Sequence, residues 1–424
     1  HNLEVKCVID VRGKLNHFAG PYEGMKVMAA REQVAKDLEA RGLMEKVDRE
    51  YVHSVATCYK CGRDLEPMVV PNWFINVDSL KKPVINAIKK NETTFTPKRH
   101  KKQILDWLAV MHDWPISRQI VWGIRIPVWY PIGKAAITVS FISKSGEREH
   151  GNVHELLKKY DLSEIKAGLQ SLVASVGTPF VVSVDSPGED YLPETDTFDT
   201  WFSSGQWPIV TNPPAYPTDF MGTYSDILKF WVSRMMMFGI YLKNDVPFRD
   251  VYLWSMVADK NGLKMSKSKG NVVDPMELVE KYGADALRMS LMFGVASGSK
   301  IIFSEDKVRG MRNFANKVWN IARFVAQDRK IQDTNNKIQI NNDDDRWILE
   351  ELEKTTKTVT RALERYRFNT ASEYLYEFIW HKFADVYIEK IKSREADAQP
   401  TLELVLEQSL KLLHPFMPFV TEAI

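Results

Sequence analysis

The sequence has 424 residues, of which 44% are hydrophobic and 26% charged, and its formal net charge is only +2. These values predict a soluble globular protein of two to four domains, and they neither require nor exclude a nucleic-acid partner. Three cysteines, an odd number in so long a chain, argue against a disulfide framework and favour a reducing compartment, so we expect a cytoplasmic location. The longest apolar run, 235–242, is too short to cross a bilayer, so no membrane partner is expected.

The first half of the sequence predicts several small α/β pieces. Residues 1–52 alternate between strand-like and helix-like patterns, with an amphipathic helix over 29–42 that ends at a glycine. Residues 98–102 form a basic run, which in most proteins is only a solvated face. Residues 131–195 have the pattern of an insertion of modest regularity, with two short strands and one short helix.

A cysteine pair with metal-ligand spacing lies near the start of the chain. Cys58 and Cys61 form one CxxC, and His53 is a candidate third ligand. Zinc needs four thiolate or imidazole ligands, and the remaining cysteine, Cys7, is isolated in the sequence. The pattern therefore leaves two interpretations open, a zinc site and a pair of reduced thiols.

A candidate small-molecule pocket follows in the middle of the chain. Residues 199–208 place two tryptophans beside small residues and a glycine, which is typical of a rigid apolar recess, although a plain core cluster has the same composition. A long apolar helix is predicted over 227–241, and Asp226 stands at its start. There the carboxylate can serve a cationic amine, or it can simply cap the helix.

The string KMSKSKGN at residues 264–271 is the most informative part of the sequence. It places three lysines on a short loop bounded by Gly262 and Gly270. Two of the ammonium groups, Lys264 and Lys267, are spaced to bracket the β- and γ-phosphates of a nucleotide and to stabilise the charge that builds up on departing pyrophosphate. A lone KxxK is most often a solvated basic turn, but the full string is much rarer.

The segments around this loop predict an α/β layer followed by a helical bundle. A strand-like run, 250–257, precedes the loop, and a helix over 276–292 follows it, with Asp274 as the N-cap. From residue 305 onward the pattern is helical, and its aromatic stripes predict the core of a bundle. The aromatic residues expected in that core are Trp347, Tyr374, Phe378, Trp380, Phe383 and Tyr387.

The lysine string resembles the KMSKS signature of the class I aminoacyl-tRNA synthetases, and other strings make the resemblance more specific. TWFSS at 200–204 and ISRQ at 116–119 match the valine-specific branch of that family better than the isoleucine and leucine branches. RNFANKVWN at 312–320 is close to that branch's pattern at the entry to its anticodon-binding bundle. The resemblance covers essentially the whole chain. It implies an α/β fold in which the C-terminal part of a Rossmann-like catalytic domain precedes an all-α anticodon-binding bundle.

Three segments follow from this resemblance. Residues 1–52 would be the C-terminal remnant of an inserted editing domain, and residues 53–304 the second half of the catalytic domain, with an insertion near 131–195. Residues 305–424 would be a truncated helical anticodon-binding domain. The family's other signature, a His-x-Gly-His turn, does not occur in these 424 residues. We therefore expect a fragment whose isolated active site is incomplete and inactive.

The function that the resemblance implies is that of a valine–tRNA ligase. Such an enzyme activates valine with ATP to valyl-adenylate and transfers it to tRNA(Val), with Mg²⁺ accompanying the ATP, and we expect a monomer. Because threonine is nearly isosteric with valine, the whole enzyme would also need editing. Two alternatives remain at this stage: an isoleucine-specific synthetase, and a non-catalytic module that holds tRNA through the bundle and residues 98–102.

Residue roles are carried over from the family by position. The ATP-binding residues would be Lys264, Lys267 and Val257, of which both lysines would be catalytic and Val257 would offer backbone groups to adenine. The amino-acid pocket would be formed by Trp201, Asp226 and Ile227, with Asp226 near the amino group or the ribose. Residues expected to bind tRNA by charge and stacking are Arg312, Lys317, Arg323, Arg365 and Arg367.

Overall fold

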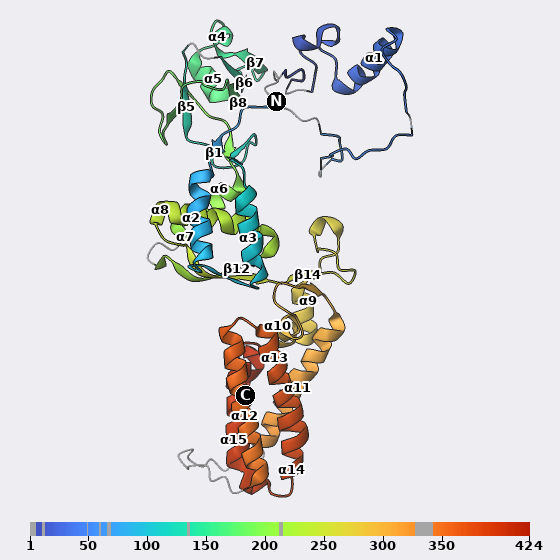
Figure 1. Cartoon of the computed structure of the whole chain (residues 1–424), viewed down its shortest axis with the longest axis vertical. Helices are drawn as coiled ribbons and strands as arrows, with labels where there is room; N and C mark the ends of the chain where they lie inside the picture. Colours follow the sequence, from blue (N-terminus) through green and yellow to red (C-terminus); the bar gives the residue numbers. More distant parts are fainter. Residues whose placement is uncertain are drawn as a thin grey trace. The chain divides into compact units, whose positions relative to one another are not determined.

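The structure is a computed structural model, and it describes residues 6–10, 13–48, 50–58, 61–65, 69–133, 136–211, 215–326 and 342–424, apart from the side chain of Ser268 (Figure 1). The chain forms two compact units. Unit 1 comprises His1–Phe74 and Pro115–Phe198, and unit 2 comprises Ile75–Trp114 and Asp199–Ile424. The chain passes between the units within the short strands β1 (Phe74–Ile75) and β3 (Trp114–Pro115) and again after β11 (Thr197–Phe198). These bounds differ from the three segments expected from the sequence, which stay a prediction.

The N-terminal part of unit 1 contains the helix that the sequence predicts. The 3-10 helix η1 (His17–Tyr22) leads to α1 (Val27–Ala40), which begins two residues before the expected start. The hydroxyl of Tyr22 donates to Asp37 Oδ2 at 2.8 Å and joins the two helices. Gly42 follows α1 with φ of 66°, so the helix ends at a left-handed glycine, as the sequence indicates.

The rest of unit 1 is more regular than the sequence predicts. One antiparallel sheet has the order β7 (Arg148–Asn152), β6 (Ile137–Ile142), β8 (Leu169–Ala174), and α4 (Val153–Leu156) and α5 (Leu162–Gly168) contact β6. A second antiparallel sheet has the order β10 (Tyr191–Pro193), β5 (Val128–Pro131), β9 (Val181–Val182), and β11 pairs with β4 (Ser117–Arg118). Ile137, Val139 and Phe141 alternate along β6 and are fully buried. One partner strand, β7, follows β6 closely, whereas the other, β8, begins only at Leu169, a pairing that a local pattern does not reveal.

Unit 2 contains the expected layer of parallel strands. Its sheet has the order β12 (Thr218–Tyr224), β13 (Phe248–Trp254), β2 (Thr94–Thr96), with both neighbouring pairs parallel. The helix α3 (Arg99–Val110) contacts β2, and α2 (Asp78–Lys89) contacts both α3 and α8 (Ser233–Lys243). A separate parallel pair, β14 (Met256–Ala258) and β15 (Lys300–Ile302), carries the chain into and out of the lysine loop region. The expected α/β layer is confirmed, and its third strand, β2, comes from a much earlier part of the chain.

Two long helices expected from the sequence are interrupted. The helix expected over 276–292 is two helices, α9 (Pro275–Tyr282) and α10 (Ala284–Met292), because Gly283 adopts φ of 88° and ψ of 149°. The helix expected over 227–241 begins earlier, as a 3-10 turn η3 (Ser225–Ile227) and a π-helical turn η4 (Leu228–Val232), before it becomes α8. The sequence pattern of apolar spacing does not distinguish these helix types.

The C-terminal part of unit 2 is the expected helical bundle. Its elements are α11 (Glu305–Ala326), α12 (Asp343–Glu364), α13 (Phe368–Tyr376), the π-helical η6 (Glu377–Ile388), α14 (Glu389–Ile391), α15 (Glu395–Leu413) and α16 (Pro418–Ala423). Figure 1 shows the long helices α11, α12 and α15 running side by side. Of the expected core aromatics, Phe378, Phe383 and Tyr387 are fully buried, whereas Trp347 and Trp380 are partly buried. Tyr374 is 48% exposed, so its expected burial is wrong.

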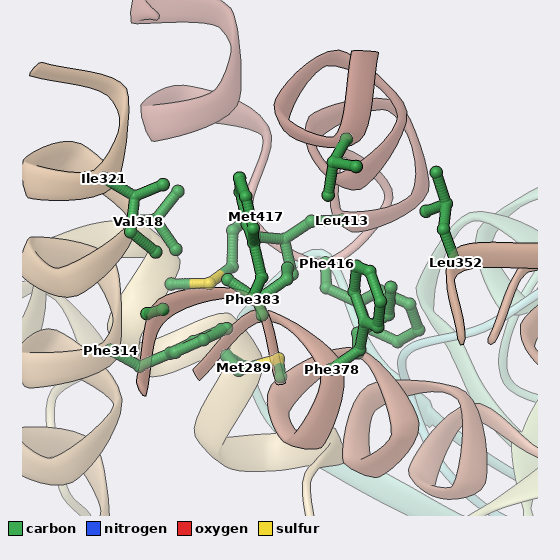
Figure 2. Packing of buried hydrophobic residues seen from close by; sticks show 14 of the residues in the cluster. Met289, Phe314, Val318, Ile321, Leu352, Phe378, Phe383, Leu413, Phe416 and Met417 are labelled. Carbon is green, nitrogen blue, oxygen red and sulfur yellow. The ribbon is translucent and has the colours of Figure 1, made fainter. Parts of the chain in front are cut away.

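The core of the bundle extends into the helices that follow the lysine loop. Met289 of α10 lies in the same buried cluster as Phe314 of α11 and Phe383 of η6 (Figure 2). Met417, after α15, completes the cluster. The lysine loop is therefore followed directly by helices that are packed into the bundle core. None of the described helices is both long enough and apolar enough to span a membrane.

Candidate functional site

The lysine loop, residues 259–271, is held at both ends by one carboxylate and one amide. Asp259 Oδ1 accepts the backbone N–H of Leu263 at 2.8 Å, and Asp259 Oδ2 accepts Asn271 Nδ2 at 2.8 Å. Asn271 Oδ1 in turn accepts the backbone N–H of Ser266 at 2.9 Å. These hydrogen bonds, the one from Asn271 first, hold the pKa of Asp259 below its ordinary value. The loop thus has a defined shape although its lysines are exposed.

Sequence reasoning missed Asp259 and Asn271. A signal was present, because Asp259 begins the string DKNG, and aspartate followed by asparagine and glycine is typical of a tight turn. Gly262 and Gly270 have φ of 73° and 65°, so each end of the loop needs a left-handed residue.

The structure brings Lys264 to Asp226. A bridge pairs Lys264 with Ala258 at the end of β14, and the Nζ of Lys264 lies 2.9 Å from Asp226 Oδ2. Asp226 lies inside the 3-10 turn η3, so its carboxylate serves this lysine rather than capping the helix. Lys267 lies in a second 3-10 turn, η5 (Lys267–Lys269), with its side chain exposed to solvent. Val257 is partly buried on β14, one residue before the bridge.

The same helical segment that carries Asp226 also contacts Trp201. Trp201 lies on the short helix α6 (Thr200–Ser204), and its ring stacks on Phe230 with centroids 5.8 Å apart and planes 23° apart. Phe230 follows Asp226 by one helical turn, and Ile227 between them is partly buried. Trp231 donates its indole N–H to the carbonyl of Ser204 at 2.9 Å, which fixes the end of α6 against η4. The segment 225–232, formed by η3 and η4, therefore contacts both the lysine loop, through Asp226, and Trp201, through Phe230.

A buried arginine contacts the aromatic residues next to Trp201. Arg234 on α8 is 5% exposed, and burial lowers its pKa to about 10, an effect that Asp199 partly offsets. Its guanidinium lies over two aromatic rings, 4.8 Å from the Trp114 centroid and 5.6 Å from that of Phe230. Sequence reasoning missed Arg234 and Phe230, because they lie inside an apolar helix pattern that indicates only burial.

The cysteine pair gains no further ligands among the residues that the structure describes. Neither Cys58 nor Cys61 forms a disulfide among the described residues, and the backbone N–H of Gly62 donates to the Cys58 carbonyl at 2.8 Å. Within the described ranges, no three His, Cys, Asp or Glu side chains come together as a metal site. The described side chains around this pair therefore do not supply the four ligands that tetrahedral zinc needs.

Unit 1 has a cavity of about 610 Å³ whose most buried carboxylate is structural. Glu194 Oε2 accepts the indole N–H of Trp73 at 2.9 Å and the hydroxyl of Tyr130 at 2.7 Å. Glu194 Oε1 accepts the backbone N–H groups of Thr195 and Asp196 at 2.6 and 3.0 Å. Burial, with the charge of Glu194, raises the pKa of Tyr130 well above its ordinary value. The four donors satisfy this carboxylate, which holds Trp73, Tyr130 and the backbone at 195–196 together.

The basic residues expected to bind tRNA are distributed over separate parts of the bundle. Arg312 and Arg323 are both exposed on α11, roughly 16 Å apart along its axis. Lys317 is engaged within the bundle, because its Nζ lies 3.0 Å from Asp385 Oδ1 and 5.6 Å from the ring of Trp380. Arg365 and Arg367 lie in the turn before α13.

One of these residues lines a groove. A groove of about 750 Å³ is bounded by α11, α15 and α16 and includes Trp319, Arg323, Glu407, Lys411 and His414. Trp319 is 44% exposed. An exposed indole beside an arginine is suited to stacking on an unpaired base and contacting its phosphate.

Comparisons with known proteins place these features in context. Residues 5–304 match the family model described as tRNA synthetases class I (I, L, M and V), and residues 345–424 match the anticodon-binding domain of tRNA ligase. The valine–tRNA ligase of Geobacter sulfurreducens is 39% identical over 444 aligned positions that cover 100% of this chain and 46% of the relative. That of Thermotoga maritima is 38% identical, with coverage of 100% and 46%. The chain thus spans about half the length of these relatives.

Solved structures share the fold at lower identity. Methionyl-tRNA synthetase of Mycobacterium tuberculosis, bound by methionyl-adenylate, superposes with a TM-score of 0.58 at 16% identity, over 88% of this chain and 65% of that one. LeuRS of Agrobacterium radiobacter K84, in a ternary complex with tRNA and LeuAMS, has a TM-score of 0.51 at 21% identity, over 74% and 41%. At these identities the likeness concerns the fold alone.

Proposed function

The chain belongs to the class I tRNA synthetases of the isoleucine, leucine, methionine and valine group, and on that premise we propose that it is part of a valine–tRNA ligase. Such an enzyme activates valine with ATP and transfers the valyl group to tRNA(Val). The choice of valine is supported by the names of the relatives that match the whole chain. We also propose the three-segment division, with the catalytic part at 53–304 and the tRNA-binding part from 305 onward. The cytoplasmic location and the monomeric state stay predictions.

The contact between Lys264 and Asp226 is the observation that carries this proposal. The 2.9 Å pair places a candidate phosphate-binding ammonium and a candidate amine-binding carboxylate at one site, where bound ATP and valine would displace the pair and lie next to each other. The carboxylate of valine attacks the α-phosphate, and pyrophosphate leaves with negative charge. Lys264 and Lys267 would neutralise the β- and γ-phosphates, and Asp226 would hold the amino group of valine. Val257 would present backbone groups to adenine.

Trp201 and Ile227 would set the size of the amino-acid pocket. Trp201 lies on α6 and Ile227 on η3. Phe230, in the turn η4 that directly follows η3, stacks on Trp201 and so connects the two elements. A wall of this kind excludes a longer side chain by steric clash, whereas it rejects threonine only about a hundredfold. Mg²⁺ would enter with ATP, since it is usually bound through substrate phosphates and keeps several waters. No protein ligand for it is assigned, because the described residues form no metal-binding group of three.

The test is valine-dependent exchange of pyrophosphate into ATP. We would measure it in a chimera in which Geobacter sulfurreducens sequence supplies the parts of the relative that this chain does not cover. Lys267→Ala should lower kcat by about a hundredfold or more, because it removes charge stabilisation in the transition state. Lys243→Ala, which removes an exposed lysine at the end of α8, is the matched control.

Exchange with isoleucine in place of valine separates the proposal from its closest alternative. A chimera that exchanges with isoleucine as well as it does with valine, or that loses no activity on Lys267→Ala, would contradict the proposal. The bundle would bind tRNA through the groove between α11 and α15, where Trp319 and Arg323 lie.

A further inference from the structure

Arg234 is a deeply buried cationic side chain near the proposed site, and the proposed binding of the ATP phosphates does not involve it. It is 5% exposed, and its Nε is buried with no hydrogen-bond partner among the residues that the structure describes. Its Nη1 donates to the backbone carbonyl of Lys229 and, at 3.3 Å, to Ser233 Oγ. A buried guanidinium with an unsatisfied N–H costs free energy, and its contacts with the neighbouring aromatic rings offset part of that cost.

Two contact paths run from Arg234 to the helix that carries Trp201. The first passes through Phe230, whose ring lies under the guanidinium and also stacks on the ring of Trp201. The second passes through Trp114, whose ring also lies against the guanidinium and whose indole N–H donates to Asp199 Oδ2 at 3.0 Å. Asp199 is the N-cap residue of α6 and is 4% exposed. The guanidinium therefore contacts rings that position both the start and the first turn of α6.

We propose that Arg234 is a positioning residue that fixes the ring of Trp201 and thereby the width of the amino-acid pocket. The role of Trp201 in this inference rests on the proposed function, whereas the link from Arg234 to Trp201 does not. A guanidinium suits this place because it is planar, delocalised and weakly hydrated, so it can lie flat on two aromatic rings in a dry environment. A lysine ammonium at the same position keeps the charge but lacks the flat surface.

The link is tested in the chain itself by fluorine NMR with fluorotryptophan in place of its 12 tryptophans. Trp201→Phe assigns the resonance of Trp201, and Trp319→Phe assigns a reference in the bundle. Arg234→Met should shift or broaden the Trp201 resonance and leave that of Trp319 unchanged. Arg249→Met is the matched control, because Arg249 is a solvent-exposed arginine that forms a surface ion pair with Asp245, at 3.1 Å.

An unchanged Trp201 resonance in a folded Arg234→Met chain would overturn the proposal. If circular dichroism shows that the methionine variant does not fold, Arg234→Lys decides, since it keeps the charge and removes the planar group. A folded lysine variant with a native Trp201 resonance would then overturn it. Phe230→Leu should displace the same resonance, because it cuts one of the two paths while Arg234 stays in place.

The effect on the pocket is tested in the active chimera. Arg234→Met should raise KM for valine about tenfold, lower the preference for valine over threonine and isoleucine, and leave KM for ATP within about twofold. A loss of kcat with no change in selectivity would show that Arg234 acts only on folding and would contradict the proposal. If the unmodified chimera performs no exchange, the proposed function fails, while the NMR result on the Arg234–Trp201 link is unaffected.

Discussion

The ion pair between Lys264 and Asp226 lies in the proposed substrate site, but it is weak enough for substrates to displace it. Both side chains are more than half exposed, at 65% and 51%, so solvent screens their attraction. Exposed pairs of this kind contribute about 0–1 kcal/mol. Ligands that bring a phosphate to Lys264 and an amine to Asp226 can therefore replace the pair at little cost. In the absence of ligands, each residue neutralises the other.

Removing the carboxylate should make the lysine more available to anions. Asp226→Asn is expected to raise the affinity of the chain for inorganic tripolyphosphate about two- to fivefold at low salt, because it removes both a competitor and a repulsive charge. Titration calorimetry at two salt concentrations measures the effect, which should shrink as salt screens it. Asp219→Asn, at an exposed position on β12, is the control. Weaker binding in Asp226→Asn would argue that the carboxylate organises the phosphate site instead.

Asp345 shows the opposite case, a charge pair that is largely buried. Its Oδ1 lies 2.7 Å from Arg394 Nη2 and accepts the hydroxyl of Tyr387 at 2.7 Å. Burial alone would raise the pKa of Asp345, but the hydrogen bonds from Arg394 and Tyr387 and the charge of Arg394 outweigh it and lower that pKa. Because the pKa is lower in the folded chain than in the unfolded one, the stabilisation is complete above the unfolded value of about 3.9 and is lost as pH falls through the folded value.

Asp345→Asn should therefore destabilise the bundle in a pH-dependent way. We expect a loss of about 2–4 kcal/mol near neutral pH, at the lower end of values for broken buried pairs because Arg394 is partly exposed. The difference from the unmodified chain should narrow below about pH 4. Urea unfolding followed by far-ultraviolet circular dichroism measures it. Asp343→Asn, at a 96% exposed side chain on the same helix, should change little; equal losses in both variants would refute the buried-pair argument.

At the scale of elements, the break between α9 and α10 determines how the lysine loop joins the bundle. α9 begins where Asp274 Oδ1 accepts the N–H of Met276 at 2.8 Å, and it ends at Gly283. The φ of 88° and ψ of 149° at Gly283 lie in a region that is essentially restricted to glycine. The break lets α10 change direction and place Met289 in the bundle core.

Two glycine-to-alanine changes should have opposite signs. Gly283→Ala should cost about 1–3 kcal/mol through backbone strain alone, since no described residue other than its chain neighbours has an atom within 4 Å of the added Cβ. Gly310→Ala, in the middle of α11 with open space around its Cβ, should stabilise by about 0.5–1 kcal/mol. Both are measured by urea unfolding. A neutral Gly283→Ala would mean that the chain can continue as one helix there, as the sequence pattern alone predicts.

At the scale of the whole molecule, the bundle is joined to the parallel sheet by a tyrosine. The hydroxyl of Tyr366, in the turn between α12 and α13, donates to Asp250 Oδ2 of β13 at 2.9 Å. Its ring contacts Phe220 of β12 and Tyr252 of β13, with centroids 5.3 and 5.9 Å away. These two strands lead to Asp226 and to the lysine loop. The proposed tRNA-binding part is thus in direct contact with the sheet that carries the candidate site.

If tRNA binds in the groove between α11, α15 and α16, the contributions of charge, from Arg323, and of stacking, from Trp319, can be measured separately. Arg323→Ala should weaken tRNA binding and reduce the slope of log affinity against log salt by about 1, whereas Trp319→Ala should cost about 1–3 kcal/mol and leave the slope unchanged. Filter binding over a salt series measures both. Arg346→Ala, an exposed arginine on α12, is the control. Equal effects of all three variants would mean that binding does not use this groove.

Sequence alone was sufficient wherever the determining interactions are local. The lysine loop, its flanking glycines, the Asp274 cap and the bundle helices all follow from patterns within a few residues, because turn residues, capping side chains and helical spacing act over one or two turns. The sequence also identified the family, since the strings at 116–119, 200–204 and 264–271 each carry their own signature.

Tertiary structure decided what depends on contacts between distant residues. Only the folded chain brings Lys264 to Asp226, 38 residues earlier, supplies β2 as the third strand, and places Arg234 between Trp114 and Phe230. The apolar pattern of 227–241 indicates burial, but it does not reveal that the charged residue within it, Arg234, contacts two aromatic rings. Helix type and strand order likewise depend on non-local packing, which outweighs the small differences in local propensity.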